Sequence, residues 1–98
     1  MTDADQPSQP PNQQQIQINV PDGQKHGSYA NFLVVSHSPH EFTLDFCQLL
    51  PSGQPDTLSA EVVSRVKIPP TLVGKVIRAL NTNMTKYEDA WGLVKEIG

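Results

Sequence analysis

Alternation of apolar and polar residues predicts β-strands over the first two thirds of the chain. Ile16, Ile18 and Val20 alternate with polar residues, which is the period of a strand with one face in solvent. Three more apolar segments follow, each bounded by proline, glycine or small polar residues. The predicted strands cover residues 15–20, 29–37, 41–50 and 57–68. Because the connections are too short for crossovers, we expect an antiparallel meander.

The predicted strands differ in how many of their faces are apolar. The second has apolar residues on both, with Phe32 and Val34 on one side and Leu33 and Val35 on the other. Such a pattern is typical of a central strand that is covered twice. In the third strand, one face is made by Phe42, Leu44 and Phe46, and the other includes Asp45 and Cys47. In the fourth, one face is expected to carry Leu58, Ala60, Val62, Val66 and Ile68.

A long helix is predicted over residues 70–91. Pro69-Pro70 suits its first turn, and Gly92 suits the first position beyond its end. Six residues form a seam with heptad spacing: Val73, Ile77, Leu80, Met84, Tyr87 and Trp91. A second stripe begins with Leu72, Val76 and Ala79 and then becomes polar. Two interpretations remain open: both stripes cover the chain's own sheet, or the seam meets the helix of a second subunit.

The predicted fold is therefore α+β, a four-stranded antiparallel meander followed by one long C-terminal helix packed on it. Residues 1–14 are rich in proline and glutamine, and we expect them to form a disordered tail ahead of a single domain over 15–98. One helix covers one face of a sheet, which leaves Leu33 and Val35 without a cover. We expect at least a homodimer that buries these residues or the helix seam.

Charge and composition exclude several functional classes. The 98 residues include 7 Lys and Arg against 10 Asp and Glu, so the net charge is −3. This balance disfavours a general nucleic-acid binder or a protein held electrostatically on a membrane. A single cysteine, Cys47, cannot form an internal disulfide, and neither a signal peptide nor a membrane span is visible. We expect a cytoplasmic protein.

Candidate chemistry is sparse. His37, His40 and Glu41 lie near one another in the sequence, but the turn expected at Pro39 separates them, so we interpret them as surface residues. Cys47 has no glycine-rich elbow beside it and is interpreted as a small buried apolar residue. We predict no catalytic, cofactor or metal site. Asp45 and Arg65 are symmetrical about the loop between the last two strands, so we expect a cross-strand ion pair.

Short motifs are spread over residues 15–92. They include Tyr29-Ala30-Asn31, His37-Ser38, Glu41-Phe42, Leu44-Asp45-Phe46, Ser64-Arg65-Val66, Ala79-Leu80, Asn83 and Tyr87-Glu88. Together they resemble a small bacterial family of short proteins of unknown function. This resemblance implies a compact α+β protein and no particular activity. The order of elements is also similar to that of SecB-like export chaperones, which is an analogy of fold alone.

These observations favour a non-enzymatic, oligomeric interaction module: an adaptor, an assembly factor or a chaperone-like protein. One alternative is a regulator associated with nucleic acid, because small dimers of strands followed by a helix can read DNA. Another is a small metal-dependent enzyme that uses His37, His40 and Glu41. The sequence does not identify a partner protein.

Overall fold

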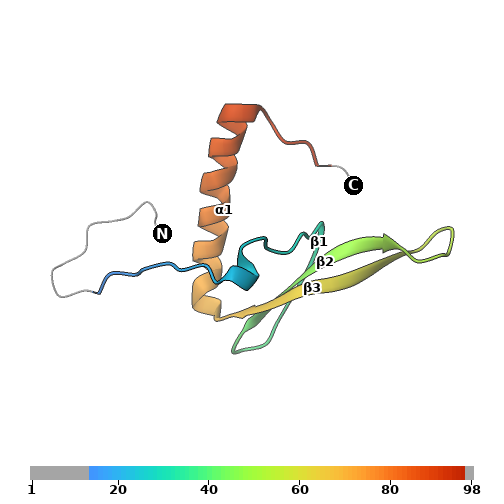
Figure 1. Cartoon of the computed structure of the whole chain (residues 1–98), viewed down its shortest axis with the longest axis horizontal. Helices are drawn as coiled ribbons and strands as arrows, with labels where there is room; N and C mark the ends of the chain where they lie inside the picture. The colour runs from blue at the N-terminus through green and yellow to red at the C-terminus, as the bar shows by residue number, and fades with distance from the viewer. Residues whose placement is uncertain (1–13, 97–98) are drawn as a thin grey trace. The chain divides into compact units, whose positions relative to one another are not determined.

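The computed structural model describes residues 14–96 and shows strands followed by a helix (Figure 1). Its elements are η1 (Asp22–Gln24), β1 (Phe32–His37), β2 (Phe42–Pro51), β3 (Leu58–Ile68) and α1 (Pro70–Trp91). The described residues divide into two compact units, one over residues 17–70 and one that includes residues 71–96. The α+β class is confirmed. The single domain over 15–98 stays a prediction, and all but the last residue of the predicted tail lie outside the described range.

The sheet has three strands in the order β1-β2-β3, and both pairs are antiparallel. The prediction of a fourth strand over 15–20 is wrong, because these residues have no strand structure and Ile16 and Ile18 are 80 % and 83 % exposed. Alternation states which side of a strand would be buried, but a strand also needs an edge to pair with. A turn at Pro21, whose carbonyl accepts a bond from the Gln24 N–H at 2.8 Å, opens an irregular connection to β1 instead of a hairpin.

The central strand is β2, so the prediction that the doubly apolar strand is central is also wrong. That strand, β1, lies at an edge of the sheet and begins at Phe32. Just before it, Asn31 stays attached to β2: its N–H donates to the Cys47 carbonyl, and its Oδ1 accepts from the Leu49 N–H, both at 3.0 Å. The backbone and side chain of Asn31 thus extend the pairing with β2 by one residue before the start of β1.

A tight turn at Ser38–Glu41 joins β1 to β2. The Ser38 N–H donates to the Glu41 carbonyl at 2.9 Å, and the Ser38 Oγ accepts from the His40 N–H at 3.2 Å. His37 and Phe42 flank the turn, and their rings stack with centroids 5.2 Å apart. Proline fixes the backbone of the second turn position, as expected from the sequence.

A β-bulge interrupts the pairing of β2 with β3. Phe46 pairs with Ser64 but Cys47 pairs with Val62, so Val63 is an extra residue without an opposite. Alternation along β3 is therefore interrupted at Val63. Side chains before and after it that strict alternation would place on one face lie on opposite faces of the sheet. The prediction that Leu58, Ala60 and Val62 share a face with Val66 and Ile68 is wrong for this reason.

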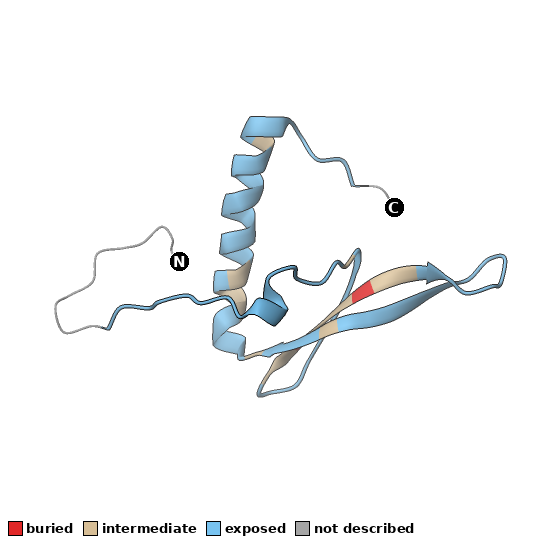
Figure 2. Ribbon diagram, in the orientation of Figure 1, coloured by how far each residue is buried: buried red, intermediate tan, exposed pale blue. Residues whose placement is uncertain are grey.

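The bulge gives the sheet one apolar area on each face, at opposite ends. We call one the Leu44 face; its apolar area is formed by Leu33, Val35, Phe42, Leu44, Phe46, Val66 and Ile68, and Leu50 lies apart from it on the same face. We call the other the Cys47 face; its apolar residues are Phe32, Val34, Cys47, Leu49, Leu58, Ala60 and Val62. Only Cys47 and Thr43 are buried among the described residues, and both lie on the central strand (Figure 2).

The helix α1 has the bounds that the sequence predicts, Pro70–Trp91. Gly92 ends it with a φ of 100°, a left-handed conformation that glycine adopts without a Cβ clash. Its N–H donates to the Glu88 carbonyl at 2.9 Å, which closes the last turn. None of the 22 residues of α1 is buried.

Candidate interaction surfaces

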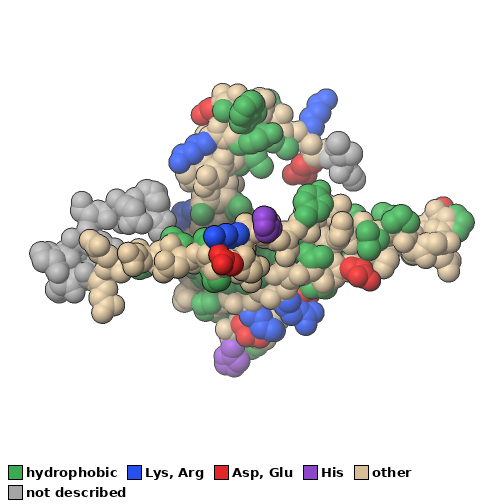
Figure 3. All heavy atoms as spheres, viewed as in Figure 1, with side chains coloured by type: hydrophobic (Ala, Val, Ile, Leu, Met, Phe, Trp, Pro, Cys, Tyr) green, Lys and Arg blue, Asp and Glu red, His purple; other side chains and the backbone are tan. Residues whose placement is uncertain are grey.

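The heptad seam of α1 presents a continuous row of exposed apolar side chains. Five of its residues are exposed, from 46 % for Met84 to 78 % for Trp91, with Ile77, Leu80 and Tyr87 between these values. Val73, near the start of the helix, is half-buried. Hydrophobic side chains gather over the C-terminal end of α1 in the space-filling view (Figure 3). Most of the stability of a protein helix comes from packing its apolar face, so this exposure indicates a missing cover.

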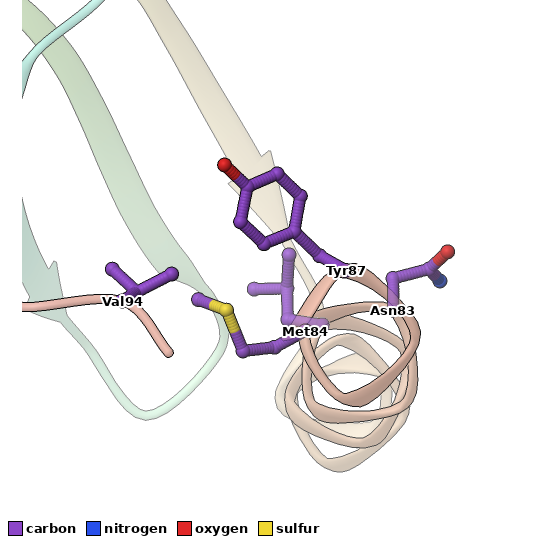
Figure 4. Close-up of a pocket in the computed structure, with 5 residues that line it drawn as sticks. Asn83, Met84, Tyr87 and Val94 are labelled. Carbon is purple, nitrogen blue, oxygen red and sulfur yellow. The ribbon is translucent and has the colours of Figure 1, made fainter. Parts of the chain in front are cut away.

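A hollow lies on this seam, between the helix and the segment that follows it. It has a volume of about 590 Å³ and is lined by Leu80, Asn83, Met84, Tyr87 and Val94. Met84 points toward Val94, and Asn83 points away from it (Figure 4). Except for Asn83, the lining is apolar, which suits a large apolar side chain rather than a charged ligand.

The chain turns back at Gly92 to form one wall of the hollow. Beyond the glycine, the Val94 N–H donates to the Glu88 Oε2 at 3.0 Å. A carboxylate acceptor makes this bond stronger than one between neutral groups, so Glu88 holds Val94 near the end of the helix. The sequence prediction of the seam did not include Val94 or Asn83. The available signal was Gly92, because a left-handed residue followed by apolar residues often returns a chain onto its helix.

The edge strand β1 presents a second apolar surface. Leu33 and Val35 are about half exposed on the Leu44 face, and Phe32 and Val34 are similarly exposed on the Cys47 face. β1 carries no charged residue or proline, the features that commonly protect an edge from pairing with another chain. The structure thus brings Leu33 and Val35 together on one face, as the sequence predicts, but at the edge of the sheet.

Charged side chains form a short polar band on the Cys47 face. Asp45 and Arg65 are paired in register, and the Arg65 guanidinium donates two bonds to the Asp45 carboxylate, at 2.6 and 3.1 Å. Beside them the Lys67 Nζ donates to the Glu41 Oε2 at 2.9 Å and to the Thr43 Oγ1 at 3.1 Å. The hydrogen bond from Arg65 lowers the pKa of Asp45 from its ordinary value, and the same bond raises the pKa of Arg65. A carboxyl group held ionised in this way is a structural group and a poor general acid.

The remaining candidate residues are not gathered into a reactive site. The thiol of Cys47 is covered, with the side chain only 2 % exposed and its Sγ donating to the Asp45 carbonyl at 3.4 Å. His37 stacks on Phe42, whereas His40 lies in the turn. Within residues 14–96, no three His, Cys, Asp or Glu side chains lie close enough to hold a metal ion.

Comparison with known protein families identifies the family to which the chain belongs. A family model described as "Protein of unknown function (DUF3467)" matches residues 1–96. The chain belongs to this family. The motifs listed from the sequence fall inside the matched range, and the resemblance to a family of unknown function is confirmed. Neither the curated proteins nor the solved structures contain a match. In the described part of the chain, α1 is not apolar enough to cross a membrane.

Proposed function

We propose that the protein is a non-enzymatic interaction module that works as a homo-oligomer, in the manner of an adaptor, an assembly factor or a chaperone. The observation that carries this proposal is the long helix without a buried residue, whose seam is an uninterrupted apolar stripe. Apolar areas on both faces of the sheet support it, because each is a surface that a second protein chain can cover. Contiguous exposed apolar patches of this kind mark surfaces that meet another protein.

In this proposal the seam of α1 meets the second subunit. The shorter stripe of Leu72, Val76 and Ala79 is apolar only over the first half of the helix. Ile77 and Leu80 on the seam are more than half exposed. This is the second of the two interpretations that the sequence leaves open.

Sedimentation equilibrium of the full chain tests the oligomer directly. We expect a mass of twice the 10.8 kDa of the chain at micromolar concentrations. A folded monomer over the whole concentration range would overturn the proposal. Light scattering of a chemically unfolded model protein then separates the roles: suppressed aggregation at equimolar amounts indicates a chaperone, and unchanged aggregation indicates an adaptor or assembly factor.

A further inference from the structure

The seam of α1 has the spacing of a helix–helix contact. Its alternation of four and three residues over six positions is the pattern by which one helix packs against another. A second helix with the same spacing therefore fits the seam.

We infer that the seam pairs with the same seam of a second copy, with the two α1 helices antiparallel around a two-fold axis at Thr82. This inference rests on the proposed function and names the surface that joins the subunits. In this register three layers form, each occurring twice. Val73 meets the partner's Trp91, Ile77 meets the partner's Tyr87, and Leu80 meets the partner's Met84.

Side-chain size supports the antiparallel register. The two largest residues of the seam, Tyr87 and Trp91, lie at its C-terminal end, and the smallest, Val73, lies at its start beside Gly74. Antiparallel pairing places large residues opposite smaller ones, which fills the layers evenly. Parallel pairing would stack Trp91 on the partner's Trp91 and leave the Val73 end thin.

The helix dipoles favour the same direction. In an antiparallel pair the positive N-terminal end of each α1 lies beside the negative C-terminal end of the other, whereas a parallel pair would place like ends together.

The hollow beside Met84 provides space for this contact. Its lining by Leu80, Met84, Tyr87 and Val94 lies on the central and C-terminal parts of the seam. In the inferred register, the partner's Leu80 and Ile77 approach this region, and each is a branched apolar side chain of the kind that fills such a hole. The bond from the Val94 N–H to Glu88 keeps the wall of the hollow in place.

The exposed area agrees with a stable pair of subunits. With about 200 Å² for a large side chain, the five exposed seam residues present roughly 600 Å² per chain. Two copies then bury about 1,200 Å², which is the lower limit of interfaces in specific complexes. Leu93 and Val94, which follow the helix and are exposed to 88 % and 46 %, extend the same surface.

Charge exchange across one layer tests the inference. Ile77→Glu and Tyr87→Lys each place an unpaired charge in the seam, and we expect each to weaken dimerisation about 100-fold or more in sedimentation equilibrium. The double variant Ile77→Glu/Tyr87→Lys should regain at least about tenfold, because each new glutamate meets the partner's Lys side chain introduced at position 87. Within one helix these positions are ten residues, or about 15 Å, apart, so rescue requires a second copy.

A matched control fixes the direction of the helices. In a mixture of Tyr87→Glu with Tyr87→Lys, the two charges lie about 15 Å apart across the antiparallel register but meet directly across a parallel one. We expect no rescue of dimerisation in this mixture. Rescue here, without rescue in Ile77→Glu/Tyr87→Lys, would overturn the antiparallel pairing.

Mixing the two single variants keeps the test decisive if either one unfolds alone. In a heterodimer of Ile77→Glu with Tyr87→Lys, one of the two layers between positions 77 and 87 is native and the other is a charge pair, so the mixture should recover the helical circular dichroism signal and the dimer mass. Failure of both the double variant and the mixture would show that the seam is covered otherwise, and the inference would be wrong. A wild-type dimer unaffected by Ile77→Glu would refute the seam but leave the proposed function standing, whereas a wild-type monomer would refute both.

Discussion

At the scale of single residues, the most specific contact in the sheet is the bidentate pair between Asp45 and Arg65. It forms because the two residues face each other in the β2–β3 register, two positions from the bulge. The pKa of Asp45 is lowered by the bond from Arg65. A carboxyl group with a lowered pKa in the folded state stabilises the protein above its unfolded pKa, and this contribution is lost as the pH falls through the lowered value.

Asp45→Asn should therefore change how the melting temperature depends on pH under acidic conditions. We expect the variant to melt below the wild type at neutral pH, and the difference to shrink as the pH falls below the ordinary carboxyl pKa of about 4 and through the lowered pKa of Asp45. Differential scanning calorimetry over this pH range measures it. Asp56→Asn, in the exposed β2–β3 turn, is the control. A difference between Asp45→Asn and the wild type that stays constant with pH would contradict the role of the ion pair.

Cys47 makes a second prediction at this scale. Because its side chain is almost fully covered, the thiol should react with an aromatic disulfide reagent only when the sheet opens. We expect labelling at least about 100-fold slower in the native protein than in urea-unfolded protein, measured by absorbance. Rapid labelling of the native chain would show that the Cys47 face is open to solvent at this point.

At the scale of elements, two backbone features decide where apolar side chains point. The bulge at Val63 reverses the face of the first half of β3, and the left-handed Gly92 directs the chain back from the end of α1. Both are single residues whose effect extends over a whole segment. Each can be removed without changing the apolar pattern of the rest of the chain.

Deletion of Val63 should move Leu58, Ala60 and Val62 to the opposite face. The Cys47 face would lose three of its seven apolar residues, and we expect a loss of about 2 kcal/mol or more in the free energy of unfolding. Urea denaturation measures this value. The substitution Val63→Thr, which keeps the extra residue, should cost clearly less. Equal losses would mean that the side chain matters and the bulge does not.

Gly92→Ala should destabilise the end of α1. A Cβ at a φ of 100° is strained, and the cost is about 1–2 kcal/mol. Gly23→Ala is a matched control, because no atom lies within 4 Å of its added Cβ and its φ is not left-handed. We expect a lower melting temperature for Gly92→Ala only. If both variants melt with the wild type, the glycine is not needed to end the helix.

At the scale of the whole molecule, assembly depends on how many apolar surfaces the chain exposes and how many of its own elements can cover them. The chain supplies one helix, and the sheet has an apolar area on each face. Leu33 is about half exposed on β1, next to Leu44 and Phe46 on the same face. Its environment in solution depends on whether its cover comes from the same chain or from a second one.

Leu33→Asp separates the two cases. If a second subunit covers the Leu44 face at β1, the buried carboxylate opposes association and leaves a folded or partly folded monomer. If the chain's own helix covers it, the same change unfolds the protein at every concentration. Sedimentation together with circular dichroism distinguishes the two outcomes. Wild-type dimer mass with unchanged stability in the variant would show that Leu33 stays in solvent.

The sequence by itself determined the elements with strong local signals. Pro70 and Gly92 bound α1 correctly because a missing N–H and a left-handed φ are properties of single residues. The pairing of Asp45 with Arg65 followed from a hairpin of fixed length. The tertiary structure alone decided that residues 15–20 stay outside the sheet, that β1 is an edge, and that Val63 divides the faces of β3. Pairing partners and bulges depend on which backbone edges meet, and the period of side chains along one strand carries no record of that.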